Sequence, residues 1–288
     1  MKVHDFRRIL LAVDGSLQSQ NAVEVVADFA PRSAEVQVVH VWNLEVTDAQ
    51  GWWDVETRSE AQRLVDGYAA RLTDAGLKAT GRLRTGAATH FAREIAVAAE
   101  EFAADLIAMG SRGRSDLGGL FLGSVSHEVV AQTDRPVLIV RAAPRLAKTT
   151  RRIVLALAGG EEIPSAVGTT ITVARKWQAD VVVLHVSRIV AVEAMAWAEP
   201  AEDARIAVGA AVRELKDAGV PARGQITTGA GPIAAEIAEV AEGVDADLIV
   251  MGSRRLGELR GLLTGATDHA LVHRIQTPIL ITERGREA

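Results

Sequence analysis

The sequence predicts an α/β protein of two tandem domains, each an open, mostly parallel sheet of five strands with helices on both faces. Three observations lead to this prediction. Short apolar runs, of which residues 9–13 are the first, are typical of parallel strands that are covered on both sides. Longer segments with helical periodicity lie between these runs. Four segments of the first half return in the same order in the second half, which indicates a duplicated domain.

The repeat also places the domain boundary. The matched pairs of segments are 7–13 with 151–157, 36–41 with 181–186, 105–112 with 247–254, and 135–140 with 277–282. Pro144 and polar residues interrupt the pattern between Ala142 and Thr150. We therefore expect one domain over residues 1–145 and a second over residues 149–288.

The expected elements of the first half alternate between strand and helix. Ser16 is expected to cap the first helix and Gly76 to end the second, since these residue types favour the two helix ends. The strand after Gly76 alternates polar and apolar residues, so one of its faces is expected to be exposed. In chain order the elements are strand 9–13, a helix that carries Val23, Val26, Ala27 and Ala30, strand 36–42, helix 56–75, strand 77–84, helix 90–102, strand 105–109, a helix from Val129 onward and strand 137–141. The second half is expected to repeat this order.

Composition and charge exclude several classes of protein. The chain has 288 residues, and 48% of them are hydrophobic, which is enough for two cores and argues against disorder. The net charge of −5 gives no support for nucleic-acid binding, and the lack of cysteine excludes disulfides and thiolate metal sites. No apolar run reaches the length of a membrane span, and the first residues lack the apolar core of a signal peptide. We therefore expect a cytoplasmic protein.

A glycine-bearing segment lies where the fourth strand is expected to lead into a helix. Gly110 and Gly113 follow the strand, and Gly123, Ser124 and Ser126 stand at the expected start of the helix. Backbone N–H groups in such a loop can bind an anion, glycine leaves room for a phosphate, and the serines add hydroxyl donors. The segment lacks the lysine of a Walker A loop and the glycine spacing of the dinucleotide fingerprint. We interpret it as a phosphate-binding loop, although glycines near a turn are also common in purely structural loops.

The spacing Gly-2x-Gly-9x-Gly-Ser, formed here by Gly110, Gly113, Gly123 and Ser124, closely resembles the ATP-binding signature of the universal stress protein family. The resemblance covers nearly the whole chain as two copies. It implies a Rossmann-like fold of the adenine nucleotide alpha hydrolase type. It also implies ATP as the ligand, alone or with Mg²⁺, and a role as a regulatory or sensory module in the stress response.

By this resemblance, three loops at the carboxyl ends of the strands form the ATP site of the first domain. The implied residues are Ala12, Val13, Asp14, Val41, Met109, Gly110, Arg112, Gly113, Gly123, Ser124, Val125 and Ser126. In the family, the aspartate that matches Asp14 lies beside the nucleoside, and the residue that matches Val41 contributes main-chain atoms near the adenine. The corresponding, weaker second site comprises Val186, Gly252, Arg254, Gly265, Ala266 and Thr267.

The second copy differs from the first at three site positions. It lacks the carboxylate beside the nucleoside, it carries a bulky though positively charged side chain where a glycine approaches the phosphates, and it has lost one hydroxyl donor. The replacements are Ala158 for Asp14, Arg255 for Gly113 and Ala266 for Ser124. We expect one tightly held ATP per chain, in the first half, unless main-chain contacts and Arg255 suffice in the second.

Several of these residues also have a structural interpretation. Asp14, in an Asp-Gly-Ser sequence, is also typical of a turn, although the partner loops favour a ligand role. His40 and His185 occupy matched positions in the two copies, which favours a structural role over catalysis. Asp105 is expected to cap or orient the turn before its strand. Arg112 either screens phosphate charge or is an ordinary exposed arginine. Trp42, Trp52 and Trp53 cluster around the long polar loop of the first half, and they are expected to anchor this loop or to face a partner, with a lid over the base as the third alternative.

The sequence offers no evident catalytic machinery. No Ser/His/Asp arrangement and no metal-ligand spacing stands out, so no catalytic residue and no metal ligand is assigned, and any ATPase activity is expected to be slow. Two alternatives stay open: a slow nucleotide hydrolase of the same fold, and an interaction protein that needs no nucleotide. By the same family resemblance, the last strands of the two halves, residues 137–141 and 279–283, are expected to pair antiparallel. The chain would then be a built-in dimer that associates further into a homo-oligomer.

Overall fold

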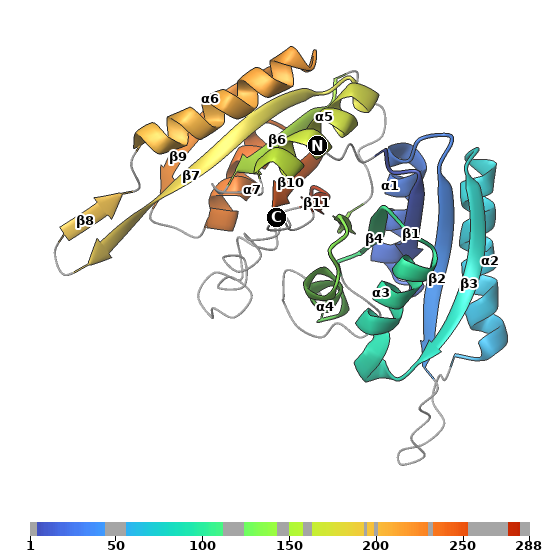
Figure 1. Ribbon diagram of the computed structural model, residues 1–288. Helices are drawn as coiled ribbons and strands as arrows, with labels where there is room; N and C mark the ends of the chain where they lie inside the picture. The colour runs from blue at the N-terminus through green and yellow to red at the C-terminus, as the bar shows by residue number, and fades with distance from the viewer. Residues whose placement is uncertain are drawn as a thin grey trace. The chain divides into compact units, whose positions relative to one another are not determined.

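A computed structural model describes residues 5–43, 56–111, 124–142, 150–157, 163–192, 195–198, 201–229, 233–252 and 276–282. The chain divides into two compact units, one formed by the described residues up to 142 and the other by those from 150 onward. Each unit is an α/β structure in which helices pack against parallel strands (Figure 1). The predicted fold class is therefore confirmed.

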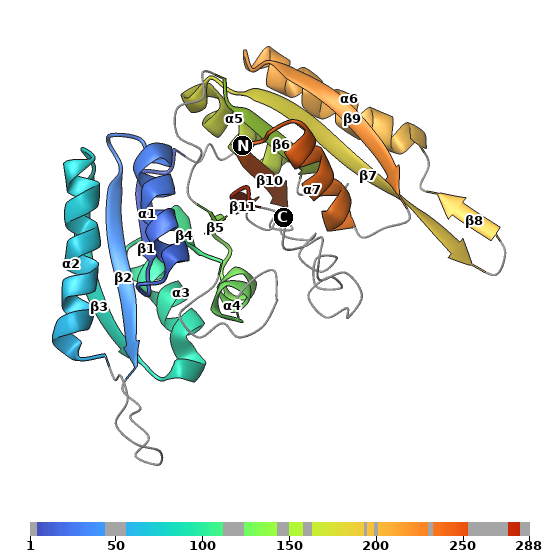
Figure 2. The ribbon, with the colours of Figure 1, turned by 180° about the vertical axis from the view of Figure 1, so that it is seen from behind.

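In the first unit, the described strands are all parallel and lie in the order β3-β2-β1-β4-β5. The direction of winding reverses between β1 and β4, which opens a crevice at the carboxyl ends of such strands. Helices α1 and α2 pack together on one face, and α3 and α4 on the other (Figures 1 and 2). The elements are β1 (Arg8–Ala12), α1 (Leu17–Phe29), β2 (Glu35–Asn43), α2 (Arg58–Asp74), β3 (Lys78–Gly86), the 3₁₀ turn η1 (Ala88–His90), α3 (Phe91–Glu101), β4 (Leu106–Gly110), α4 (Ser124–Gln132) and β5 (Val137–Val140).

Local sequence sets the helix ends of this unit. The Ser16 side chain accepts a hydrogen bond from the N–H of Ser19 and caps α1. Thr57 and Glu60 form a capping box at the start of α2. Gly76 follows α2 with a φ of +86°, a left-handed conformation that residues with a Cβ rarely adopt. The helix signals expected at Ser16 and Gly76 are therefore confirmed.

Two aspartates join neighbouring strands at their amino ends. Asp105, just before β4, accepts hydrogen bonds from the N–H groups of Arg7 (2.7 Å) and Arg8 (3.1 Å). Asp247, at the matched position of the second unit, accepts one from the N–H of Arg152 (2.9 Å). This cross-strand link is present in both copies, while the expected role of the aspartate in capping or orienting the turn before its strand stays a prediction.

The second unit repeats the parallel order as β9-β7-β6-β10-β11. One feature was not expected: β7 continues past β6 and pairs antiparallel with the strand β8 (Figure 1). In this pairing Ile189 lies opposite Ala198. The β-branched residues at 189, 190 and 192 favour this extended ribbon. The elements are β6 (Arg152–Leu157), α5 (Ile163–Trp177), β7 (Asp180–Val192), β8 (Met195–Ala198), α6 (Ala201–Asp217), β9 (Ala222–Gly229), α7 (Ile233–Gly243), β10 (Leu248–Gly252) and β11 (Ile279–Thr282).

Aliphatic side chains fill the core of each unit. Among the largest fully buried side chains, all except Phe29 are leucine or isoleucine, in keeping with an aromatic content of 4%. Strands covered on both faces need such branched residues. The packing holds the strand ends in register, and those ends carry the expected site residues. The pairing expected between residues 137–141 and 279–283 stays a prediction.

Candidate functional site

Described segments of three strands meet at the carboxyl edge of the first unit. Ala12, the last residue of β1, lies beside Met109 of β4 on one side and Val39 of β2 on the other. Gly110 ends β4 and lies beside Val140 of β5. Because parallel strands end at the same edge, this register brings the expected residues of β1, β2 and β4 together. The buried members of this set are Ala12, Val13, Val41 and Met109.

Asp14 forms the turn that follows β1. Its Oδ1 accepts a hydrogen bond from the N–H of Ser16 (3.0 Å), and its own N–H donates to Ser19 Oγ (3.4 Å). Gly15, inside this turn, has a φ of +80°. Burial raises the pKa of Tyr68 in α2, and the Asp14 carboxylate adds to this increase, so the carboxylate lies near that helix. The turn-forming interpretation of Asp14 is confirmed, while its contact with a nucleoside stays a prediction.

Gly110 is a site of close packing between β4 and α1. A Cβ on this residue would lie 2.9 Å from the carbonyl carbon and from the Cβ of Gln18, so the helix could not approach the strand as it does. This contact by itself explains the glycine. The phosphate role expected for Gly110 stays a prediction, and it does not follow from the missing Cβ.

The next residue, Ser111, was not among the expected site residues. Its N–H donates to the carbonyl of Val140 (2.8 Å), and the residue is only 1% exposed. Its Oγ is buried and has no hydrogen-bond partner among the residues that the structure describes. Buried hydroxyls are nearly always hydrogen-bonded, so this one needs an explanation. It lies at the beginning of the glycine-bearing segment, where a polar ligand atom would satisfy it.

The start of α4 contributes Ser124, Val125 and Ser126. Ser124 is exposed, whereas Ser126 is buried and donates from Oγ to the carbonyl of Ser111 (3.2 Å). A hydroxyl has only one hydrogen to donate. In this structure that hydrogen is used within the protein. The contacts expected between a phosphate and the hydroxyls of Ser124 and Ser126 stay predictions.

Other expected residues lie outside the described ranges. In the first half these are Arg112, Gly113 and Gly123, and in the second half they are Ala158, Arg254, Arg255, Gly265, Ala266 and Thr267. Of the expected second site, the structure describes Val186 and Gly252, and both are buried. Gly252 lies beside Thr282 of β11, as Gly110 lies beside Val140 in the first unit. The two described edges therefore share the same strand register.

A hydrogen-bonded group in β2 borders the first site and was expected only in part. His40 Nδ1 lies 2.8 Å from the carbonyl oxygen of Val13, and His40 Nε2 lies 2.8 Å from Glu56 Oε2. Trp42 Nε1 donates to the carbonyl of Glu56 (2.8 Å). Trp42 therefore anchors the chain just before α2, as expected. The contact between His40 and Glu56 joins residues 16 apart in the sequence, and no local motif announces it.

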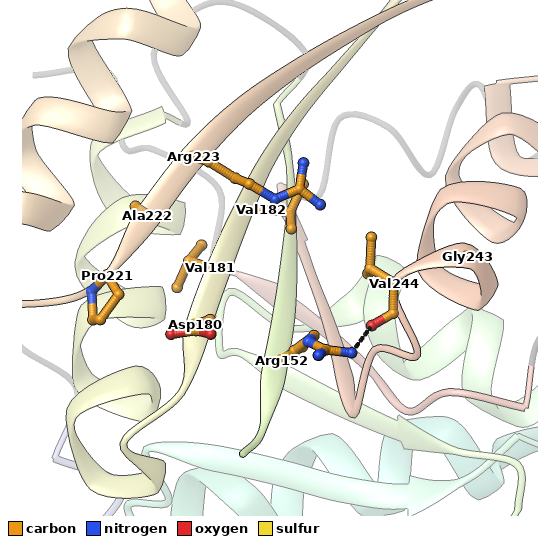
Figure 3. Close-up of a pocket in the computed structure, with 9 residues that line it drawn as sticks. All are labelled: Arg152, Asp180, Val181, Val182, Pro221, Ala222, Arg223, Gly243 and Val244. Atoms are coloured by element: carbon orange, nitrogen blue, oxygen red, sulfur yellow. Dashed lines mark hydrogen bonds between the residues drawn. The ribbon is translucent and has the colours of Figure 1, made fainter.

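A separate pocket lies at the opposite, amino-terminal edge of the second unit (Figure 3). It has a volume of about 500 Å³ and is lined by Arg152, Asp180, Val181, Val182, Pro221, Ala222, Arg223, Gly243 and Val244. Arg152 donates from Nη1 to the carbonyl of Val244 (2.9 Å). In the first unit, Phe102 holds the position of Val244, and the guanidinium of Arg8 lies 4.6 Å from its ring centroid. The pocket is far from the carboxyl edge where ligands of such folds bind.

No group of three or more His, Asp or Glu side chains in the described ranges could hold a metal ion. No described helix is both long enough and apolar enough to cross a membrane.

Comparison with known proteins places the two units in one family. The model of the universal stress protein family matches twice, at residues 5–141 and 149–283. A universal stress protein of Thermus aquaticus is 36% identical over 142 residues, which is 47% of this chain and 99% of that protein. A universal stress protein of Mycobacterium tuberculosis is 22% identical over 293 residues, and the match covers 96% of this chain and 97% of that protein. The chain is thus similar to single-domain relatives and to a relative of its own length.

A solved structure agrees with this comparison at the level of the fold. The crystal structure of a universal stress protein from Archaeoglobus fulgidus matches with a TM-score of 0.71 and 23% identity, and the match covers 98% of this chain and 97% of the chain in that structure. The chain therefore belongs to the universal stress protein family, and the family's domain occurs once in each half.

Proposed function

We propose that the first half of the chain binds one ATP molecule and that the protein is a regulatory or sensory module of the cytoplasmic stress response. The observation that carries this proposal is the buried Ser111 hydroxyl, which lacks a hydrogen-bond partner among the described residues. It follows β4 at the edge that also carries Asp14 and the start of α4. Ligands of open parallel sheets bind at this edge.

The residues at this edge fit an adenine nucleotide. The exposed Ser124 begins α4, where main-chain N–H groups and the helix dipole favour a phosphate. Asp14 supplies a carboxylate that can accept hydrogen bonds from ribose hydroxyls. Mg²⁺, where it accompanies the nucleotide, would be held mainly by the phosphates, since the described residues hold no carboxylate cluster for it.

We propose binding rather than turnover as the activity of this site. Two described carboxylates at or beside this edge are engaged within the protein: Asp14 accepts a hydrogen bond from the N–H of Ser16, and Glu56 lies 2.8 Å from His40 Nε2. Positioning of a triphosphate without a base or charge stabilisation supplies only part of the barrier reduction that hydrolysis needs. When bound, the nucleotide would therefore act as a signal that stabilises one state of the protein.

Native mass spectrometry of the freshly purified full chain tests the proposal, because it gives the identity and the stoichiometry of a bound ligand together. We expect the mass of one adenine nucleotide per chain, and calorimetric titration of the stripped protein with ATP, ADP and cyclic AMP then ranks the three. Binding of none of them would refute the proposal and favour an interaction protein. Steady ATP turnover at about 1 s⁻¹ or faster, the low end of ordinary enzymes, would instead favour a hydrolase.

A further inference from the structure

His40 makes two hydrogen bonds to groups that accept hydrogen bonds. It is buried in β2, with Nδ1 at 2.8 Å from the carbonyl oxygen of Val13 and Nε2 at 2.8 Å from the carboxylate of Glu56. A carbonyl oxygen has no hydrogen to donate, so Nδ1 must carry one. The tautomer that points a donor at Val13 is therefore fixed by the surroundings of the ring.

The carbonyl of Val13 belongs to the peptide unit that leads into Asp14. The N–H on the other side of the same peptide, that of Asp14, donates to Ser19 Oγ (3.4 Å). Because a peptide unit is planar, a donor that fixes its carbonyl also fixes the direction of its N–H and of the following Cα. His40 and Ser19 thus hold the two sides of the unit from which Asp14 extends.

The other side of the histidine ring is held by the beginning of α2. Glu56 precedes Thr57, whose side chain caps this helix, and Trp42 Nε1 donates to the Glu56 carbonyl. The Glu56 side chain is only 21% exposed. Its main chain and its carboxylate are therefore both attached to β2, by Trp42 and His40 respectively.

We propose that His40 is a positioning residue for nucleotide binding in the first half: it ties the end of β1 to the start of α2 and so sets the place of Asp14. This inference rests on the proposed nucleotide site. In this arrangement His40 acts through Val13 and does not itself contact the nucleotide. The donor at Nδ1 is the part that matters for affinity, whereas the contact with Glu56 orients the ring.

Three variants of the full chain separate this role from a general contribution to stability. His40→Leu removes both hydrogen bonds, whereas His40→Asn keeps a donor close to the place of Nδ1 and loses only the contact with Glu56. His185→Asn is the matched control, since His185 is the corresponding buried residue of β7. ATP affinity is measured by calorimetric titration, and thermal unfolding of each variant is measured beside it.

We expect His40→Leu to lose roughly tenfold or more in ATP affinity, because Asp14 is then no longer held where its carboxylate can bond the nucleotide, and one such hydrogen bond is worth about this much. His40→Asn is expected to stay within about threefold of the parent, although it is destabilised as well, and His185→Asn to leave the affinity for the first ATP unchanged. A purely structural role would instead make the affinity follow the melting temperature in all three. If His40→Leu does not fold, His40→Asn decides, and a tenfold loss there overturns the inference.

The ring itself gives a second readout that is independent of nucleotide. In ¹⁵N-labelled protein, the Nδ1 resonance of His40 is expected in the range of a protonated nitrogen, and an unprotonated Nδ1 would overturn the inference. A parent protein that binds no adenine nucleotide overturns the proposed function and this inference with it. A parent that binds ATP, together with a folded His40→Leu that binds equally well, overturns this inference alone.

Discussion

The hydroxyl of Ser126, in the first turn of α4, donates a hydrogen bond of 3.2 Å to the main-chain carbonyl of Ser111, directly after β4. Both residues are buried, with 2% and 1% of their surfaces exposed. This bond ties together the two ends of the glycine-bearing segment, residues 112–123. The two serines of α4 are therefore expected to have different roles. Ser126 bonds the residue that precedes the segment, and the exposed Ser124 is expected to meet a ligand.

Replacement of the two serines is expected to separate stability from binding. Ser126→Ala leaves a buried carbonyl without its partner, so we expect a loss of about 1–3 kcal/mol in the free energy of unfolding. Ser124→Ala changes an exposed residue, so its stability is expected to stay within about 0.5 kcal/mol of the parent while ATP affinity falls about tenfold. Urea unfolding and calorimetric titration measure the two effects. Equal behaviour of the two variants in both measurements would refute the division of tasks.

The glycines of the segment are expected to respond differently to a side chain. Gly110→Ala forces a Cβ to within 2.9 Å of Gln18, so α1 must shift and the melting temperature is expected to fall. Gly113→Val and Gly123→Val, by contrast, are expected to abolish nucleotide binding while the fold persists, because a branched Cβ would intrude on the phosphates. Circular dichroism with ATP titration checks this. A folded Gly113→Val that binds ATP as tightly as the parent would contradict the phosphate-loop interpretation.

Acid is expected to weaken the first unit through Glu101. A hydrogen bond from Arg84, supported by the charges of Arg84 and Arg82, lowers the pKa of this carboxyl in the folded state. A lowered pKa contributes stability above the ordinary pKa of the carboxyl, and this contribution is lost as the pH falls through the folded-state value. The stability of Glu101→Gln should therefore decline less between pH 7 and about pH 3 than that of the parent.

Urea unfolding at several pH values measures this difference. Glu100→Gln is the matched control, since Glu100 is the exposed neighbour of Glu101 on the same helix. We expect the gap between Glu101→Gln and the parent to be widest near neutral pH and to close in acid. A gap that stays constant with pH, or that opens equally for Glu100→Gln, would count against the role of Arg84.

The fold could be predicted because its signals are local and occur twice. Apolar runs, the Ser16 cap and the Gly76 end each depend on a few neighbouring residues, and the repeat supplied the domain count. The strand β8 was missed because the sequence repeat was the guide to the second half, and the matched segments of the repeat do not include residues 195–198.

The candidate site could be predicted only where a motif carried it. The turn at Asp14 follows from Asp-Gly-Ser, but the reason for glycine at 110 lies in Gln18, on a different element. The bond between Ser126 and Ser111 and the pair of His40 with Glu56 depend on tertiary approach. Polar contacts across elements have no fixed spacing in the sequence, so the most informative contacts of this site required coordinates.

The two halves are expected to bind nucleotide unequally, and the sequence difference at Asp14 is the clearest test. The second half has Ala158 at that position, so it lacks the carboxylate beside the nucleoside. A lost hydrogen bond to a charged group costs about 1.5–3 kcal/mol. Together with the loss of one hydroxyl at Ala266, this corresponds to roughly two orders of magnitude in affinity.

One tightly bound ATP per chain is therefore expected, and Asp14→Ala should lower the affinity for this ATP by about tenfold or more, since the variant removes one such hydrogen bond.

The reciprocal change, Ala158→Asp, returns a carboxylate to the second half and tests the same idea as a gain of binding. Arg255 opposes full recovery, because a bulky side chain replaces the glycine where the phosphates approach, so Ala158→Asp with Arg255→Gly is expected to bind more ATP than Ala158→Asp alone. Calorimetric stoichiometry near one in the parent and approaching two in the double variant supports this account. Two equal sites in the parent, or an unchanged affinity in Asp14→Ala, would refute it.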